Sequence, residues 1–307
     1  GKATNPKIRL FQVKRVPSHS PLDDVEGAWE ACSPESVKGF SGAAYFFGRK
    51  LHEELDIPIG LILCAWGATT IEAWTPRDVQ LDDPIAKQIM DNVDKWAHRY
   101  DEAKAKERYE KAMVSWQERF AAYKEGGYKG PWPSKPALQR HPQQNQHYPG
   151  NLYNGMINPI VPFAIRGAIW YQGESNSKRA EDYEQSLKRM IAAWREEWGQ
   201  GDFPFYFVQL PNFRSPWTMP IEHEDWPILR EAFLNTARTV PHTGMAITID
   251  IGDISNIHPK NKQAVGDRLA RIALRKTYGR MDHAWSGPYY TDCRMEGGKA
   301  TVTFENG

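Results

Sequence analysis

Strand-like and helix-like segments alternate along most of the 307-residue sequence. Apolar runs of strand length fall at residues 7–13, 57–66, 167–171, 204–210 and 245–250. Segments with apolar residues at helical spacing fall at residues 41–55, 180–198, 228–240 and 261–278, and Ser41 stands where a helix N-cap is expected. Repeated strand–helix alternation favours a parallel sheet with helices on both faces. We therefore predict an α/β fold of three layers, α/β/α, with a central parallel sheet in the flavodoxin-like manner.

One segment interrupts this alternation. Residues 83–125 are dense in Lys, Glu, Ala and Arg, with apolar residues at helical spacing, and predict an inserted long helix or helical hairpin. Residues 126–150 are rich in Pro, Gly, Gln and His and predict a long loop that crosses back to the sheet. We expect residues 1–285 to form one domain, and residues 286–307 to begin a C-terminal β region that is cut short.

Composition excludes several classes of protein. The 39 basic and 38 acidic residues give a net charge of +1, which disfavours nucleic-acid binding. No apolar run approaches the roughly 18 residues that span a bilayer, so we expect no membrane segment. Cys32, Cys64 and Cys293 have no metal-binding spacing, and the histidines form no ligand pair, so we expect no metal and no cofactor. Nothing in the sequence fixes the oligomeric state.

Polar loops follow three of the predicted strands. Gly67 follows the first buried strand, Glu174 and Asn176 follow the second, and Asp253 and His258 follow the last. In an open parallel sheet, ligands bind beyond the carboxyl ends of the strands. Backbone N–H groups, an amide, carboxylates and an imidazole together suit acyl transfer. Each residue alone has a structural interpretation, as a turn glycine, a solvated carboxylate or a residue near a helix cap. Their common position favours a hydrolytic site.

Four segments resemble one family. They are "CSPESVKGFSGAAYFFGRKLHEEL", "WGATTIEAWTP", "LYNGMINPIVPFAIRGAIWYQGESN" and "DIGDISNIHPKNKQAVGDRLARIAL". They are similar to the sialate O-acetylesterase family of SGNH-fold carbohydrate esterases, and the similarity covers essentially the whole chain. The resemblance implies a Ser-dependent esterase that removes acetyl groups from sialic acid or other acetylated glycans.

The resemblance also implies roles for individual residues. Gly67 and Asn176 would donate to the oxyanion, and His258 would be the general base. Two positions depart from the family pattern, because Ala68 replaces a second glycine and Asn256 replaces an aspartate. The acid partner of the imidazole therefore stays open between Asp253 and Glu174.

The nucleophile of the family lies in a Gly-Gln-Ser-Asn-Met motif upstream of the first strand seen here, and no such motif occurs in this sequence. We expect the chain to be truncated at both ends and to lack its first strand together with the nucleophilic serine. Ser33, Ser41 and Ser175 are poor replacements for it. Ser41 has the position of a helix cap, Ser33 lies in an unrelated loop, and Ser175 lies in the block that the resemblance assigns to the oxyanion.

Aromatic residues flank these loops. We predict Trp66, Trp74 and Gln172 as substrate-binding residues, with Trp170 and Tyr171 around or beneath the same pocket. Packing of these rings in the core is the alternative.

Two functions follow. The first is a carbohydrate esterase whose substrate is an acetylated glycan. The alternative is a carbohydrate-binding relative that keeps the pocket without catalysis. The resemblance further implies export to the periplasm or the cell exterior.

Overall fold

The computed structural model describes residues 3–127, 130, 132–161, 163–216, 218–219, 221, 223–282 and 284–305. Its strands are β1 (Asn5–Gln12), β2 (Trp29–Cys32), β3 (Ile59–Leu63), β4 (Ala168–Trp170), β5 (Phe205–Val208), β6 (Thr243–Ala246), β7 (Tyr289–Glu296) and β8 (Lys299–Glu305). Its α-helices are α1 (Gly42–Leu55), α2 (Ile71–Trp74), α3 (Pro84–Ala97), α4 (Glu102–Lys124), α5 (Tyr183–Trp198), α6 (Asp225–Thr239) and α7 (Lys262–Lys276). Short helical turns are η1 (Ser36–Gly39), η2 (Asp78–Gln80), η3 (Pro142–Gln144), η4 (Tyr153–Ile157), η5 (Asn158–Ile160) and η6 (Glu174–Asp182).

The central strands form two groups of three. In the β1 group the order is β2-β1-β3, and β1 pairs in parallel with β3 and antiparallel with β2. In the β4 group the order is β4-β5-β6, and both pairs are parallel. The α/β fold with a central parallel sheet flanked by helices is therefore confirmed. The last central strand is shorter than predicted: β6 ends at Ala246, and the chain then turns toward α7, where Asp250 pairs with Arg268.

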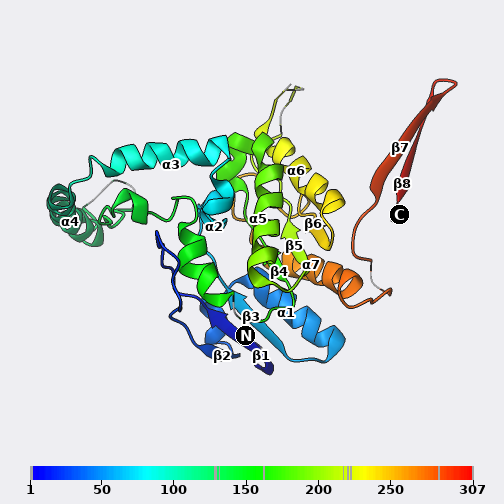
Figure 1. Cartoon of the computed structure of the whole chain (residues 1–307), viewed down its shortest axis with the longest axis horizontal. Coiled ribbons are helices and arrows are strands. Elements are labelled where there is room, and N and C mark those ends of the chain that lie inside the picture. The colour runs from blue at the N-terminus through cyan, green and yellow to red at the C-terminus, as the bar shows by residue number, and fades with distance from the viewer. Residues whose placement is uncertain are drawn as a thin grey trace.

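Helices cover both faces of these strands (Figure 1). On one face, α5 and α6 pack through Leu187, Ile191 and Phe233. On the other, α1 and α7 pack through Leu51 and Leu269. Each of the two hydrophobic clusters takes side chains from both strand groups. The two groups therefore share the same pair of covering layers, which makes them neighbouring parts of one three-layer architecture.

The edges of the two groups differ from their interiors. Among the described residues, β3 pairs only with β1, and β4 pairs only with β5. All residues of β5, which is paired on both sides, are buried, as expected for a central strand of a covered sheet. In contrast, Ile62 and Leu63 of β3 and Ala168 and Ile169 of β4 are only partly buried. These edges thus carry apolar side chains without a neighbouring strand.

Helices α1 and α7 approach each other closely. Ser41 caps α1 as predicted, because its Oγ accepts the N–H of Ala44 at 3.3 Å. Gly266 of α7 lies against α1, where a Cβ atom would stand 2.7 Å from the backbone N of Phe47. A glycine is therefore needed here for the two helices to pack backbone to backbone.

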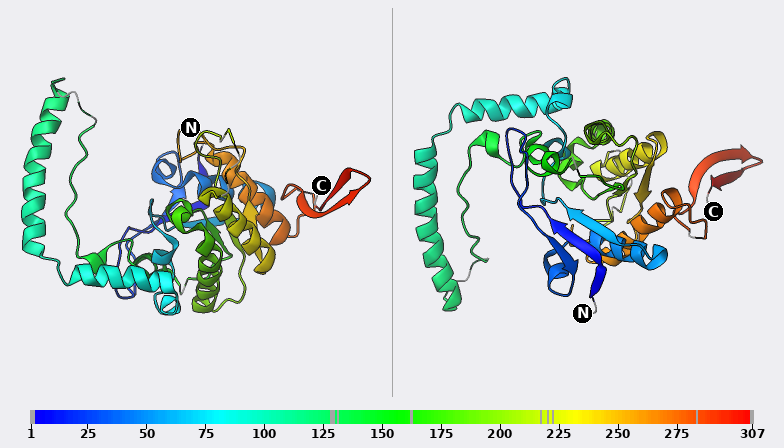
Figure 2. Two further views of the ribbon diagram at one scale, coloured as in Figure 1. Left: turned by 90° about the horizontal axis from the view of Figure 1, so that it is seen from above. Right: turned by 60° about the horizontal axis from the view of Figure 1, so that its bottom comes forward.

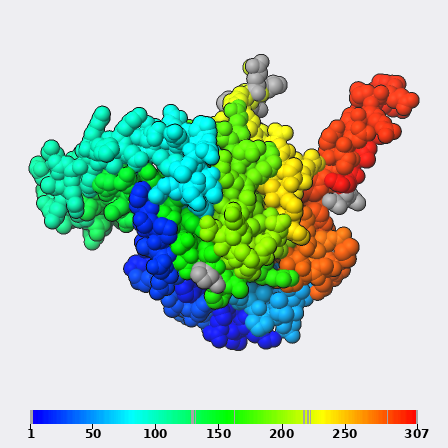
Figure 3. Space-filling model, viewed as in Figure 1, coloured from blue at the N-terminus to red at the C-terminus, as the bar shows by residue number. Residues whose placement is uncertain are grey.

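Helices α3 and α4 form an arm that leaves the body of the protein (Figure 2, Figure 3). The predicted helical insertion is present as two helices, and a bend separates them. The segment predicted as a long loop runs back along α4, where the Trp116 indole donates to the carbonyl of Pro133 at 2.9 Å. Only Ala105 is buried along α4, so most of this helix is solvated.

The β7–β8 hairpin also projects from the body (Figure 3). Its residues are exposed apart from Tyr289, and Arg238 of α6 donates to the carbonyl of Tyr290 at 3.0 Å. Asn306 and Gly307, the last residues of the predicted C-terminal β region, lie outside the described residues. No helix in the described part of the chain is both long and apolar enough to cross a membrane.

Candidate active site

The loop after β3 presents a solvent-facing backbone on a fixed base. Gly67 and Ala68 are exposed, whereas Thr69 is 2% exposed. The Thr69 hydroxyl donates to the carbonyl of Trp66 at 2.7 Å and accepts from the Trp74 indole at 2.9 Å. Ala68 has a φ of +61°, in the left-handed region that favours glycine. The backbone N–H groups around Gly67 are therefore held in place by a buried threonine and a core tryptophan.

The loop after β4 is joined to the loop after β3 by direct hydrogen bonds. Asn176 is 3% exposed, and its Oδ1 accepts from the backbone N–H of Ile71 at 3.0 Å. Gln172 Nε2 donates to the same Oδ1 at 2.7 Å and to the carbonyl of Thr69 at 3.0 Å. The structure thus brings the amide of Asn176 to the Gly67 loop, as predicted for two members of one site.

Gln172 has no free amide group for a substrate. Its two Nε2 hydrogens serve Asn176 and Thr69, and its Oε1 accepts from the Tyr183 hydroxyl at 2.8 Å. In this structure the Gln172 side chain bridges two loops, and its contact with substrate stays a prediction.

Two further residues of this region escaped the sequence analysis. Glu72 is 5% exposed, and its carboxylate accepts from Asn176 Nδ2 at 3.1 and 3.2 Å. Arg179 forms an ion pair with the same carboxylate at 2.6 Å. Buried charges require partners, but the two residues are 107 positions apart, and only the fold brings them together.

Glu174 lies among other charged groups near the end of β4. Burial raises the pKa of its carboxyl, and the charges of Lys262 and His258 partly offset this rise. Lys262 stands at the start of α7, with its ammonium 3.3 Å from the Tyr171 hydroxyl and 4.6 Å from the centroid of that ring. The loop before α7 and the loop after β4 therefore share one electrostatic environment.

The loop after β6 places His258 at the surface. The imidazole is exposed, and the backbone N–H of His258 donates to Asn256 Oδ1 at 2.9 Å. The carboxylate of Asp253 accepts from both the hydroxyl and the backbone N–H of Ser255, at 2.7 and 2.9 Å. These bonds engage Asp253 Oδ1 within its own loop. Of the two acid candidates, Glu174 is the one whose pKa responds to His258.

The aromatic residues separate into two sets. Trp74 and Trp170 are 3% and 8% exposed and meet edge to face, with ring centroids 6.1 Å apart. The Trp74 ring thus belongs to the core beneath the loop, which is the packing alternative, and its binding of substrate stays a prediction. Trp66 and Tyr171 are only partly buried, and each packs against one of the two hydrophobic clusters.

The three serines lie as follows. Ser33 Oγ accepts the N–H groups of Glu35 and Ser36, each at 3.2 Å, and Ser41 caps α1. Ser175 is exposed, between Glu174 and Asn176.

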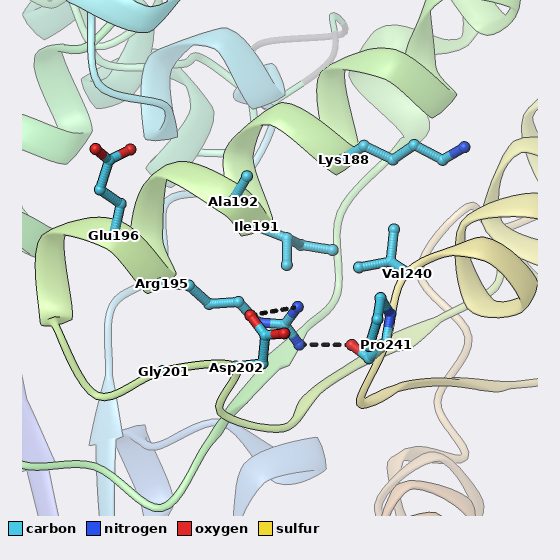
Figure 4. Close-up of a pocket in the computed structure, with 9 residues that line it drawn as sticks. All are labelled: Lys188, Ile191, Ala192, Arg195, Glu196, Gly201, Asp202, Val240 and Pro241. Carbon is cyan, nitrogen blue, oxygen red and sulfur yellow. Dashed lines mark hydrogen bonds and ion pairs between the residues drawn. The ribbon is translucent and has the colours of Figure 1, made fainter.

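Two hollows in the described part of the surface lie elsewhere. One, of about 550 Å³, is lined by α5 and by the turns that precede β5 and β6 (Figure 4). There the Arg195 guanidinium donates to the carbonyl of Pro241 at 2.8 Å. Residues 202 and 241 precede their strands, so this hollow opens at the amino ends of the strands. A second hollow, of about 450 Å³, lies between β6 and α7 beside Trp285. Neither contains a predicted site residue.

Comparison with known proteins identifies relatives of this chain. A family model described as "carbohydrate esterase, sialic acid-specific acetylesterase" matches residues 138–275. Sialate O-acetylesterases of Mus musculus and Homo sapiens are each 27% identical to it over 92% of this chain. The chain spans about half the length of these relatives, 52% and 49%. The crystal structure of a carbohydrate acetylesterase from Xanthomonas citri matches with a TM-score of 0.73 and 30% identity, over 99% of this chain and 56% of that one.

Proposed function

We propose that this chain forms part of a carbohydrate esterase, because these comparisons support the sialate O-acetylesterase family for it. The substrate class is an O-acetylated glycan, and the reaction is acyl transfer to a serine followed by hydrolysis. Gly67 and Asn176 act as oxyanion donors and His258 acts as the general base. The serine comes from a polypeptide segment outside these residues.

The observation that carries this proposal is the pair of unpaired strand edges. β3 and β4 lack a neighbour on one side among the described residues, although both belong to the same three-layer core. Their residues Ile62, Leu63, Ala168 and Ile169 are partly buried where a central strand is normally covered. One parallel strand inserted between β3 and β4 would pair with both edges and join the two groups into a single sheet.

A strand in this position would end beside the proposed site. The loops after β3 and β4 carry Gly67 and Asn176, and the carboxyl ends of parallel strands meet at one edge of a sheet. A serine just beyond the inserted strand would therefore lie between these donors. That is the arrangement in which a nucleophile and an oxyanion hole act on one carbonyl.

The chemistry of the site then follows in two halves. His258 takes the proton of the serine hydroxyl as the oxygen attacks the acetyl carbonyl, and it gives that proton to the departing sugar oxygen. The N–H groups at Gly67 and Asn176 stabilise the negative oxygen of the tetrahedral intermediate. Water then attacks the acetyl–serine ester while His258 takes one of its protons, and His258 gives that proton to the serine oxygen as acetate leaves. Glu174 is the favoured partner for the imidazolium, with Asp253 as the second candidate.

Two parts of this proposal rest on the resemblance alone. The glycan that carries the acetyl group is proposed only as a class. Export to the periplasm or the cell exterior is proposed for the same reason.

The proposal is tested by acetate release from acetylated glycans, using this chain and the longer protein that includes the segment upstream of residue 1. We expect the longer protein to be active, His258→Ala to lower kcat by about 10²–10⁴-fold, and Asn176→Ala to lower it by about 10²–10³-fold. His98→Ala is the matched control, since His98 is exposed on the arm, and should leave kcat unchanged. A folded longer protein that binds acetylated glycans without releasing acetate would instead establish the carbohydrate-binding alternative.

A further inference from the structure

Glu72 occupies a position from which it can orient the Asn176 amide. Its side chain is buried in α2, and its backbone carbonyl accepts from Gly150 N–H and from Gln80 Nε2, each at 2.9 Å. The backbone of Glu72 is therefore anchored from two directions. Its carboxylate faces Asn176 Nδ2, with N–O distances of 3.1 and 3.2 Å.

The hydrogen-bond partners of Asn176 determine where its Oδ1 and its Nδ2 point. Oδ1 accepts from the N–H of Ile71 and from Gln172 Nε2, so two donors surround it. Nδ2 faces a carboxylate, which only accepts. Turning the amide over would place its oxygen against Glu72 and its NH₂ group against two donors. The contacts therefore favour a single orientation.

One Nδ2 hydrogen remains for another acceptor. The two oxygens of a carboxylate are close together, whereas the two hydrogens of an amide diverge, so a single hydrogen points toward Glu72. The second hydrogen points away from Glu72. In the proposed site this second hydrogen would donate to the oxyanion.

Arg179 balances the negative charge of the Glu72 carboxylate. It lies 2.6 Å from Oε1, and its backbone departs from helical geometry within η6, with φ −133° and ψ 41°. A buried carboxylate without a cation is costly, and the Arg179 guanidinium offsets that cost.

We propose that Glu72, supported by Arg179, is a positioning residue that fixes the Asn176 amide with one hydrogen directed at the oxyanion. This inference rests on the proposed function of Asn176. The competing interpretation is that Glu72 only ties α2 to η6 and stabilises the fold.

A matched pair of variants separates the two interpretations. Glu72→Gln and Glu72→Met have similar volume, but only glutamine offers an oxygen to Asn176 Nδ2. In the longer protein we expect kcat for acetate release to be about 10- to 100-fold lower in Glu72→Met than in Glu72→Gln, with little difference in KM. Glu53→Gln, on the solvated side of α1, is the control and should behave as wild type.

The same pair is then compared in an Asn176→Ala background. If Glu72 acts through Asn176, the difference in kcat between the two variants disappears there, because coupled residues are not additive. A difference that persists unchanged would overturn the proposal and leave the structural role. Urea unfolding of each variant shows that the comparison is made on folded protein.

Nuclear magnetic resonance of this chain keeps the inference separate from the esterase activity. The two Asn176 side-chain hydrogens should differ in chemical shift, because one faces a carboxylate, and Glu72→Gln should already reduce that difference. Side-chain signals that are identical in wild type and Glu72→Gln would contradict the positioning role, even if the longer protein is active. An inactive longer protein with the expected shift change would refute the proposed function alone.

Discussion

Ala68 adopts a left-handed backbone conformation next to the proposed oxyanion donor, with a φ of +61°. This conformation costs a residue with a Cβ about 1–2 kcal/mol. Ala68→Gly removes that cost from the folded state. It also increases the conformational entropy of the unfolded chain, which offsets part of the gain in stability. We expect the variant to raise the free energy of unfolding by up to about 1 kcal/mol in urea titrations.

Ala103→Gly is the control for this change. Ala103 is exposed within α4, where glycine should lower the stability by up to about 1 kcal/mol. A lower stability of Ala68→Gly would mean that the left-handed conformation at this position carries no strain.

The raised pKa of Glu174 predicts a pH dependence of stability. Burial is the main cause of the rise, so the folded protein binds this proton more tightly than the unfolded chain does. As pH rises above 4.5, the ordinary pKa of a glutamate, the unfolded chain loses this proton before the folded protein does. The free energy of unfolding therefore falls until the pH has passed the folded-state pKa. We expect the stability of wild type relative to Glu174→Gln to fall over this range in urea titrations.

Glu35 is the control, because its pKa is lowered and its effect on stability should change with pH in the opposite direction. A hydrogen bond from Ser33 lowers its pKa, so the stability of wild type relative to Glu35→Gln should increase as pH rises through the folded-state pKa toward the ordinary value. If stability relative to wild type changed with pH in the same direction for Glu174→Gln and Glu35→Gln, the raised pKa of Glu174 would be contradicted.

Sequence reasoning reached some residues of the site and missed others for identifiable reasons. The cap at Ser41 depends on local bonding, which the sequence carries. Loop positions after strands also follow from the sequence, as for Asn176. The engagement of Gln172 by Tyr183 and Thr69, and the pairing of Glu72 with Arg179, depend on contacts between distant segments. No local pattern contains that information.

The arm of α3 and α4 has little support from the core. Ala105 is the one buried residue of α4, and the returning segment contributes few hydrogen bonds to it. Local stability follows buried apolar contact. We expect limited trypsin digestion to cut first within residues 104–140, which mass spectrometry would identify, while α1, α5 and α7 stay intact. First cuts within α5 would show that the arm is better protected than its exposure indicates.

Helices and strands were predictable to different degrees. The apolar spacing of α1, α5 and α7 matched their buried faces, so these helices appear within a few residues of the predicted bounds. The strand predicted at residues 245–250 ends early because Arg268 draws Asp250 and the carbonyl of Ile247 toward α7. The sequence left a long helix and a helical hairpin open for residues 83–125, since helical spacing continues on both sides of the bend between α3 and α4.

At the scale of the whole molecule, the two strand groups share layers on both faces yet do not pair with each other among the described residues. Amides of β3 and β4 that face the unpaired edges should exchange hydrogen rapidly in this chain. In the longer protein we expect the same amides to become protected, because an inserted strand accepts their hydrogen bonds. Amides of β5, which is paired on both sides, should be protected in both proteins. Hydrogen-exchange mass spectrometry measures all of them, and unchanged exchange at β3 and β4 would show that no strand is inserted.

The most direct measurement is a crystal structure of the longer protein with the residues upstream of this chain included. We expect a parallel strand between β3 and β4, followed by a serine whose Oγ lies within about 2.6–3.2 Å of an imidazole nitrogen of His258. Gly67 N–H and Asn176 Nδ2 should point to the same place beside that oxygen. A sheet in which β3 and β4 pair directly, or a serine beyond hydrogen-bond reach of His258 and both donors, would contradict the proposed active site.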